Sequence, residues 1–219
     1  MRKLLLSIIF VFFIGCSKEK QENIQQDINQ LMNINNYLIT KRKVNDSIYE
    51  VKGENKDYII AGHLNENNNK KEGWFLLNFN NPKKDTLLNV EYITFNNKEF
   101  LNQYLFFDKN KINLIKSKFY KNNIVNKNYM IHFNLPKDNL NTDSCTFTYY
   151  IIKNNNLLSS NKITGVDKFD FNIDLREYPK FDFIKGVFSC YASEKKGDSI
   201  VLGNTQIYTI FEGAPSPKQ

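Results

Sequence analysis

Lys168-Phe169-Asp170-Phe171-Asn172-Ile173-Asp174-Leu175 is the stretch that decides the fold, because polar and apolar side chains alternate in it without a break. Successive side chains of a β-strand point to opposite faces of the sheet, so this period of two predicts a half-buried strand. Its apolar residues would face a core, and its polar residues would form a solvated face.

Similar patterns recur along the chain from residue 41 onward. Short runs rich in aromatic and β-branched residues, as strands prefer, lie at 92–93, 104–107, 112–120, 129–135, 145–152, 186–192 and 207–211. Clusters of Asn, Asp, Lys and Gly separate them at 65–71, 80–84, 96–97, 108–110, 154–156 and 194–198. Short strands at this spacing, with no helix-length pattern between them, predict an all-β protein.

The chain divides into several regions in sequence. We expect an antiparallel hairpin meander over 41–122 and a small β-sandwich over 127–212. Ahead of them, apolar residues at 24, 28, 31 and 38 recur near helical spacing, which predicts a short amphipathic helix over about 22–38. Residues 213–219 are interpreted as a disordered tail.

Two short motifs resemble known β families. Glu72-Gly73-Trp74-Phe75, at the start of a strand, resembles the strands of MORN repeats, although most of the glycines that punctuate such repeats are absent. Gly186-Val187-Phe188-Ser189-Cys190 is similar to the Gly-x-Tyr-x-Cys strand of immunoglobulin domains. That second resemblance implies an Ig-like architecture for the sandwich, but no tryptophan lies between Cys145 and Cys190.

The N-terminus has the pattern of a secretory signal peptide. Met1-Arg2-Lys3 is followed by an apolar run over 4–14 and then by Gly15-Cys16. The pattern resembles a bacterial lipoprotein signal, which implies removal of residues 1–15 and attachment of lipid, palmitate included, to Cys16. A conventional signal cut elsewhere is the alternative. The apolar run reaches only about half of the roughly twenty residues that a spanning helix needs.

The lipoprotein resemblance also implies a location. Residues 16–40 would form a lipidated tether with the short helix, and the chain would lie in the cell envelope, anchored to a membrane. Ser17 is not the aspartate that retains such proteins at an inner membrane, so an outer membrane is favoured, in either leaflet.

The cysteine content allows one disulfide, and the charge content argues against nucleic acid as a partner. With Cys16 lipidated, Cys145 and Cys190 remain as a pair, which forms either one disulfide or two buried thiols. Loss of residues 1–15 leaves 28 basic residues against 23 acidic ones. Only Arg42 and Arg176 remain among the arginines and the lysines are scattered, so nucleic acid is not an expected partner.

Signals for catalysis or a cofactor are missing from the sequence. It has no Gly-x-Ser-x-Gly elbow, phosphate-binding glycine loop or His-Glu-x-x-His motif. His63 and His132 are interpreted as structural or surface residues. Asp170, Asn172 and Asp174 mimic the start of a calcium loop, but alternate strand residues lie about 6.6 Å apart, too far to wrap one ion. Glu50, Glu72, Glu91 and Asp182 are unremarkable candidates for paired catalytic acids. We therefore expect that the protein is not an enzyme and that it binds no metal ion or cofactor.

Aromatic residues and short modification motifs give the remaining hints. Six aromatic residues could form a binding surface: Trp74, Tyr149, Tyr150, Phe181, Phe183 and Tyr191. Most of them are assigned to the core, and an exposed Tyr150 or Tyr191 is the one hint of a binding surface. Three Asp-Ser/Thr-aliphatic motifs resemble the acceptor of a periplasmic O-glycosylation system, which implies glycans on Ser47, Thr86 and Ser199.

The predicted function is a membrane-anchored, non-enzymatic binding module of the cell envelope with a protein partner. An immunity protein that neutralises a bacterial toxin is the first alternative. An envelope hydrolase is the second.

Overall fold

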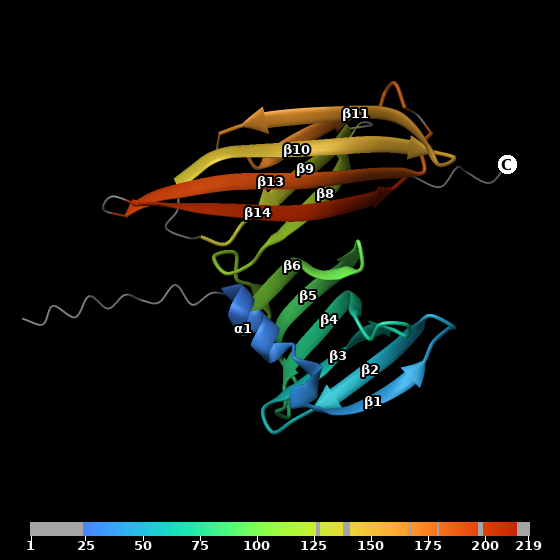
Figure 1. Ribbon diagram of the computed structural model, residues 1–219, viewed down its shortest axis with the longest axis vertical. Coiled ribbons are helices and arrows are strands. Elements are labelled where there is room, and N and C mark those ends of the chain that lie inside the picture. The colour runs from blue at the N-terminus through green and yellow to red at the C-terminus, as the bar shows by residue number, and fades with distance from the viewer. Residues whose placement is uncertain are drawn as a thin grey trace, which may run out of the picture. The chain divides into compact units, whose positions relative to one another are not determined.

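The structure is a computed structural model that describes residues 24–125, 128–137, 141–166, 168–178, 180–196 and 199–213. It is nearly all β with antiparallel sheets, as the sequence predicts (Figure 1). The described part of the chain divides into two units, the first ending at Met32 and the second beginning at Asn33. The predicted signal peptide, its Cys16 and the predicted tail from residue 214 onward lie outside the described residues.

The first unit contains α1, Ile24–Leu31, which ends earlier than the predicted 38. In the second unit the side chain of Asn33 accepts a hydrogen bond from the Asn35 N–H and caps the short 3₁₀ helix η1, Ile34–Asn36. Leu38, assigned to the helix by its spacing, instead begins the first strand and is 80% exposed.

Seven strands form an antiparallel meander in sequence order. They are β1 (Leu38–Lys43), β2 (Ile48–Glu54), β3 (Tyr58–Asn65), β4 (Lys71–Phe79), β5 (Thr86–Phe95), β6 (Lys98–Asp108) and β7 (Lys111–Ile112). One face of this sheet carries the buried side chains Val51, Ile60, Leu64, Phe75, Leu77, Leu88, Val90, Tyr92 and Tyr104.

Asparagine makes the tight turns of the meander and of the sandwich. The two-residue turns at Asn96-Asn97, Lys109-Asn110 and Asn154-Asn155 all have positive φ at both positions. Such turns match the twist of a hairpin, and asparagine enters the left-handed region more readily than most residues. The many asparagines of the chain therefore have a structural use.

The predicted strand over 112–120 is wrong. The side chain of Asn113 accepts the N–H groups of Ile115 and Lys116, which turns the chain between β7 and β8 (Phe119–Val125). Asparagine commonly competes with strand pairing in this way. Strand β8 then pairs with β9 (Asn128–Asn134), although the sequence assigns its first residues to the meander.

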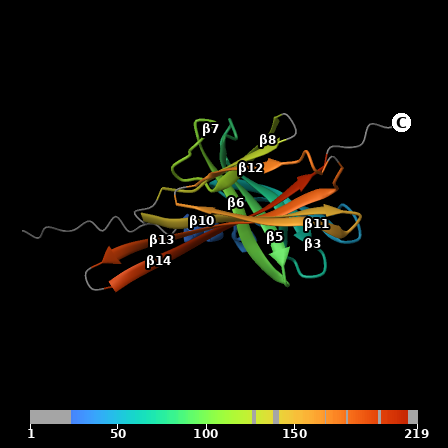
Figure 2. The ribbon, with the colours of Figure 1, turned by 90° about the horizontal axis from the view of Figure 1, so that it is seen from above.

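Two further sheets pack around one core. The three-stranded sheet has the order β12-β9-β8, and the four-stranded sheet has the order β11-β10-β13-β14. The new strands are β10 (Asn141–Lys153), β11 (Asn156–Gly165), β12 (Asp170–Asp174), β13 (Phe183–Lys196) and β14 (Ser199–Glu212). Strands β13 and β14 extend together past the start of β10 (Figures 1 and 2).

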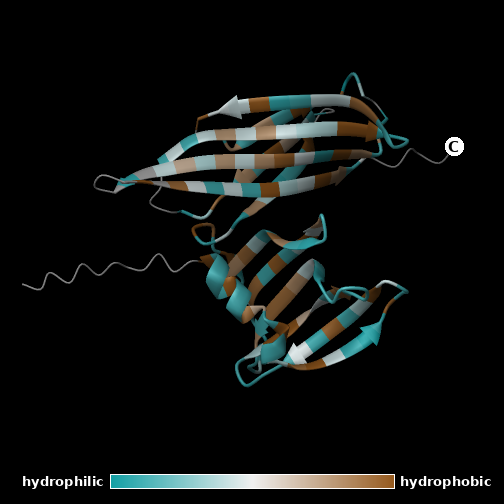
Figure 3. Ribbon diagram, viewed as in Figure 1, coloured by the Kyte–Doolittle hydropathy of each residue, from teal (hydrophilic) through white to brown (hydrophobic). Residues whose placement is uncertain are grey.

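The sandwich core is aromatic and draws on both sheets. Phe133 of β9 stacks on Phe188 of β13 with ring centroids 4.2 Å apart, and Phe147 and Phe171 pack against the same rings. The alternation quoted above is real, because Phe171 and Ile173 of β12 are buried while Asp170 and Asn172 are exposed. Figure 3 shows the same bands of apolar and polar residues along the long strands.

Candidate binding site at the edge of the sandwich

Strand β14 lies at the edge of the four-stranded sheet, and side chains cover part of its free edge. Tyr208 directs its N–H and C=O away from β13, where the carboxamide of Asn102 bonds both, at 2.8 and 2.9 Å. The β13–β14 pairing has no register shift, so every second residue of β14 exposes its backbone in the same way.

The covered part of the edge runs from Gln206 to Glu212. The ammonium of Lys118 donates to the Gln206 carbonyl at 3.3 Å, and the Tyr129 hydroxyl donates to the Glu212 carbonyl at 3.0 Å. The backbone of Ile210 hydrogen-bonds the Tyr120 hydroxyl. At four consecutive outward positions, side chains from elsewhere in the chain thus bond at least one backbone group.

A buried lysine belongs to this cover. Lys118 also donates to the Leu101 carbonyl at 3.2 Å, and its ammonium lies over the ring of Tyr104. Burial lowers the pKa of Lys118 to about 8, because the charged form loses its hydration. The contacts join the meander to the sandwich within the second unit.

The remaining part of the edge, Ile200 to Asn204, is open. Among the described residues none bonds the outward backbone groups of Ile200, Leu202 or Asn204. The side chains of Ile200 and Leu202 are 69% and 78% exposed. Apolar side chains and free backbone groups therefore occur together on one exposed strand segment.

Two other edge strands, β1 and β12, are protected by charge or short length, whereas β11 at the opposite edge of the four-stranded sheet exposes Leu157 and Leu158. Strand β1 carries the consecutive cations Lys41, Arg42 and Lys43. Strand β12 is five residues long, and its exposed positions include Asp170 and Asp174. Charged and short edge strands discourage pairing with another chain. The open segment of β14 lacks this protection.

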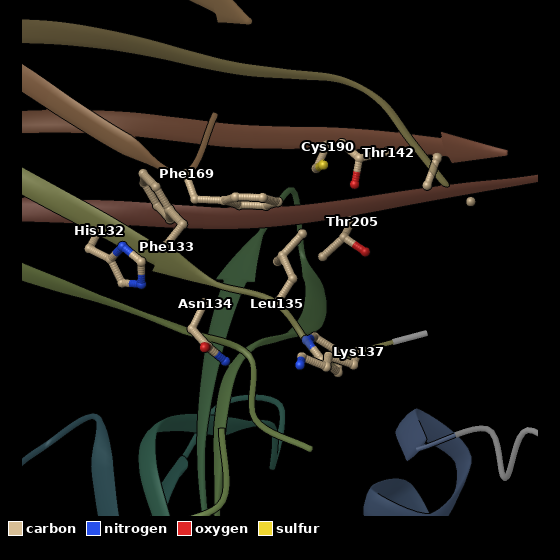
Figure 4. A pocket seen from close by; sticks show the side chains of 12 residues that line it. His132, Phe133, Asn134, Leu135, Lys137, Thr142, Phe169, Cys190 and Thr205 are labelled. Carbon is tan, nitrogen blue, oxygen red and sulfur yellow. The ribbon is translucent and has the colours of Figure 1, made fainter. Parts of the chain in front are cut away.

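A pocket of about 350 Å³ lies beside the open segment (Figure 4). Its lining comprises His132, Phe133, Asn134, Leu135, Pro136, Lys137, Thr142, Phe169, Cys190, Ala192, Gly203 and Thr205. In Figure 4, Leu135 and Lys137 lie on one side of the pocket and Cys190, Thr142 and Thr205 on the other. The volume falls within the range of pockets that hold small ligands.

The pocket exists because the inward-facing side chains of the β13–β14 pair become smaller toward this end. Bulky pairs such as Phe188 with Ile207 fill the core. The next inward pairs are Cys190 with Thr205 and then Ala192 with Gly203. Small residues opposite the end of β9 leave the space unfilled.

Among the described residues the pocket lining contains one lysine, Lys137, and no carboxylate. Lys137 is exposed, and its backbone N–H donates to the carbonyl of Ile115, which places the turn at 113–118 beside it. That turn contributes the exposed side chains of Leu114, Ile115 and Lys116. The turn thus adds apolar side chains and one further lysine beside the pocket.

His132 faces solvent on β9, as its phase in the sequence predicts. Its Nδ1 lies 2.8 Å from an Asp170 carboxylate oxygen, with the two side chains 51% and 83% exposed. Such an exposed pair contributes little to stability. In the described part of the chain no hydroxyl or thiol nucleophile bonds the ring, and no three His, Cys, Asp or Glu side chains could hold a metal ion. His63 is exposed on β3.

The four carboxylates considered as catalytic acids are not brought together. Glu50 pairs with Arg42, Glu72 accepts from Asn65, Glu91 accepts from Asn102 and Gln103, and Asp182 accepts from the backbone N–H of Asn154. No two of these described carboxylates share a partner.

The assignment of most of the six singled-out aromatic residues to the core is wrong. Tyr149 is buried and Phe181 is half-buried, but Trp74, Tyr150, Phe183 and Tyr191 are exposed. The last three occupy the outward phase of β10 and β13, so their inward neighbours fill the core instead.

The two cysteines of the sandwich are direct neighbours. Cys145 of β10 lies opposite Cys190 of β13, with Cα atoms 4.1 Å apart, and the structure joins them as a disulfide. Both side chains are buried. The sequence alone could not distinguish a disulfide from two buried thiols, because neither its periodicity nor its lack of a metal-binding motif depends on how the two cysteines are paired.

The residues of the glycosylation motifs differ in exposure. Ser47 is exposed on the turn between β1 and β2, where its N–H donates to the Asn45 side chain. Thr86 is half-buried at the start of β5. Ser199 begins β14, and its side chain is not described.

The chain matches no protein-family model, and no significantly similar curated protein or solved structure was found. The MORN-like and immunoglobulin-like resemblances therefore rest on their short motifs alone. Within the described residues, no helix has the length and apolar character required to cross a bilayer.

Proposed function

We propose that this chain is a lipid-anchored protein of the bacterial cell envelope that binds a protein partner by adding a strand of that partner to β14. The anchor would be Cys16, as the N-terminal motif implies, and an outer membrane is favoured. The role is binding rather than catalysis.

The observation that supports this proposal is the half-covered edge of β14. From Gln206 to Glu212 each outward position has at least one backbone group bonded by a side chain, whereas no described residue bonds those of Ile200, Leu202 and Asn204. In strand addition, backbone hydrogen bonds provide affinity and side-chain pockets provide specificity. An open edge segment next to a pocket supplies both requirements.

The test uses a defined strand-forming peptide and the isotope-labelled full chain in detergent micelles. The probe is acetyl-Thr-Glu-Thr-Phe-Thr-Glu-Thr-amide, and its fully N-methylated analogue cannot donate backbone hydrogen bonds. Amide hydrogen exchange is followed by NMR. We expect the probe to slow exchange at Leu202 and Asn204 at least about tenfold, because both amides become hydrogen-bonded. The Tyr208 amide, already bonded to Asn102, should not change.

A matched pair of variants separates backbone pairing from apolar contact. Leu202→Pro removes an outward N–H that makes no bond to β13, a position where an edge strand tolerates proline. Leu202→Thr retains the N–H. The proline variant should lose the protection and the threonine variant should retain it. Equal binding of the N-methylated analogue, or self-association of the chain through this edge in light scattering, would overturn the proposal.

A further inference from the structure

We infer that the pocket beside β14 selects the partner strand, by accepting one large apolar side chain whose flanking acidic residues lie near Lys137. The inference rests on the proposed strand addition. It identifies the class of partner as an extended segment with acidic residues two positions before and after an aromatic or large aliphatic residue, so that all three side chains point to the same face.

The register of the sheet determines where the side chains of an added strand would point. Side chains of directly neighbouring residues on adjacent strands point to the same face. Gly203 and Thr205 face inward and line the pocket. A strand added along the open edge would therefore direct every second side chain to the inner face of the sheet, toward this pocket.

The inner face of the sheet carries only small residues next to the open edge of β14. Gly203 has no side chain and its neighbour Ala192 has only a methyl group, so little separates the open edge from the apolar floor. Leu135 and Phe169 supply that floor, and both are half-buried. A large apolar side chain entering here would cover surfaces that are now partly exposed to water.

The charged side chains near the pocket favour an acidic partner strand. Among the described residues the pocket lining includes the ammonium of Lys137 and no carboxylate, and Lys116 is exposed on the neighbouring turn. These two lysines would attract an acidic strand and repel a basic one. Edge-to-edge pairing with a second copy would instead bring together two chains that each carry a net positive charge. The favoured occupant is therefore an acidic segment of a different protein.

The experiment compares three peptides that differ only at the central position of the probe, which is Phe, Ala or Lys. Dissociation constants are measured by fluorescence anisotropy with the full chain. We expect the Phe peptide to bind about tenfold or more tightly than the Ala peptide, because only the Phe ring fills the pocket. The Lys peptide should bind more weakly than both.

Three variants of the chain locate the effect. Ala192→Leu fills the pocket from β13 without changing the edge of β14, so it should abolish the preference for Phe over Ala. Lys137→Gln should weaken binding of the acidic peptides several-fold and reduce its dependence on salt. Lys162→Gln removes a cation that is also exposed, on β11 outside the pocket lining, and should leave both properties unchanged.

The outcomes distinguish the two proposals. Protection of the Leu202 and Asn204 amides with equal affinity for the Phe and Ala peptides would overturn the pocket inference and leave strand addition standing. Absence of protection with every peptide would overturn both. Binding of decanoate that Ala192→Leu abolishes, without any preference for the Phe peptide, would show that the pocket takes a free amphiphile rather than a strand.

Discussion

Asn102→Ala should destabilise the protein more than an average substitution, because one buried carboxamide makes three hydrogen bonds. Its oxygen accepts the Tyr208 N–H at 2.8 Å, and its nitrogen donates to the Tyr208 carbonyl at 2.9 Å and to Glu91 at 2.6 Å. The side chain is 3% exposed, so water does not replace these bonds in the native structure.

The size of the effect follows from the type of each bond. A neutral hydrogen bond contributes about 1 kcal/mol net, and one to a charged group contributes about 1.5–3 kcal/mol. Two bonds to Tyr208 and one to Glu91 therefore add to about 4 kcal/mol. Native domains have a free energy of unfolding of only about 5–15 kcal/mol, so this loss is a large fraction of the total.

Urea unfolding followed by circular dichroism measures the change, and hydrogen exchange at the Tyr208 amide shows where it originates. Asn123→Ala, at an exposed position on β8, is the control and should alter stability by less than about 0.5 kcal/mol. An Asn102→Ala variant within about 1 kcal/mol of the parent, with the Tyr208 amide still protected, would refute the capping of β14 by this side chain.

Three other predictions concern the interior. Because the pKa of Lys118 is lowered to about 8, the unfolded chain binds its proton more tightly, and stability relative to Lys118→Met should rise as the pH increases from about 8 to 10.4 in urea titrations. Gly186→Ala would place a Cβ 2.6 Å from the Phe147 ring, so calorimetry should show a loss of about 1–3 kcal/mol, and an unchanged melting temperature would contradict the close packing. Replacement of Cys145 and Cys190 by serine should cost about 4 kcal/mol for a bond that spans 45 residues, and an intact mass equal to that of the reduced chain would show that no bond forms.

The sequence predicts the all-β class because burial follows a strict period of two in several strands. Phe171 and Ile173 are buried between exposed polar residues, as their alternation indicates. The pattern fails at 112–120, where apolar residues continue through a turn. Asn113 decides the local structure there by bonding the backbone, and a periodicity argument does not weigh that competition.

The candidate site could be predicted only in part. The small residues Ala192 and Gly203, in strands whose other inward positions are bulky, are a visible signal for a gap in the core. The cover of the β14 edge is not visible in this way, since Asn102 and Tyr208 lie 106 residues apart in sequence. Only the register of three sheets reveals which outward backbone groups have partners.

The open segment of β14 is best explained by a function in binding. An exposed edge invites association, and natural proteins usually protect it with charge, short length or cover. This strand has side chain cover at four consecutive outward positions and then, from Asn204 back to Ile200, none from the described residues. At these open positions the chain places isoleucine and leucine rather than the cations that protect β1. The edge strand β11 also exposes leucines, but in the open segment of β14 the exposed apolar residues lie next to a pocket, a combination expected of a binding site.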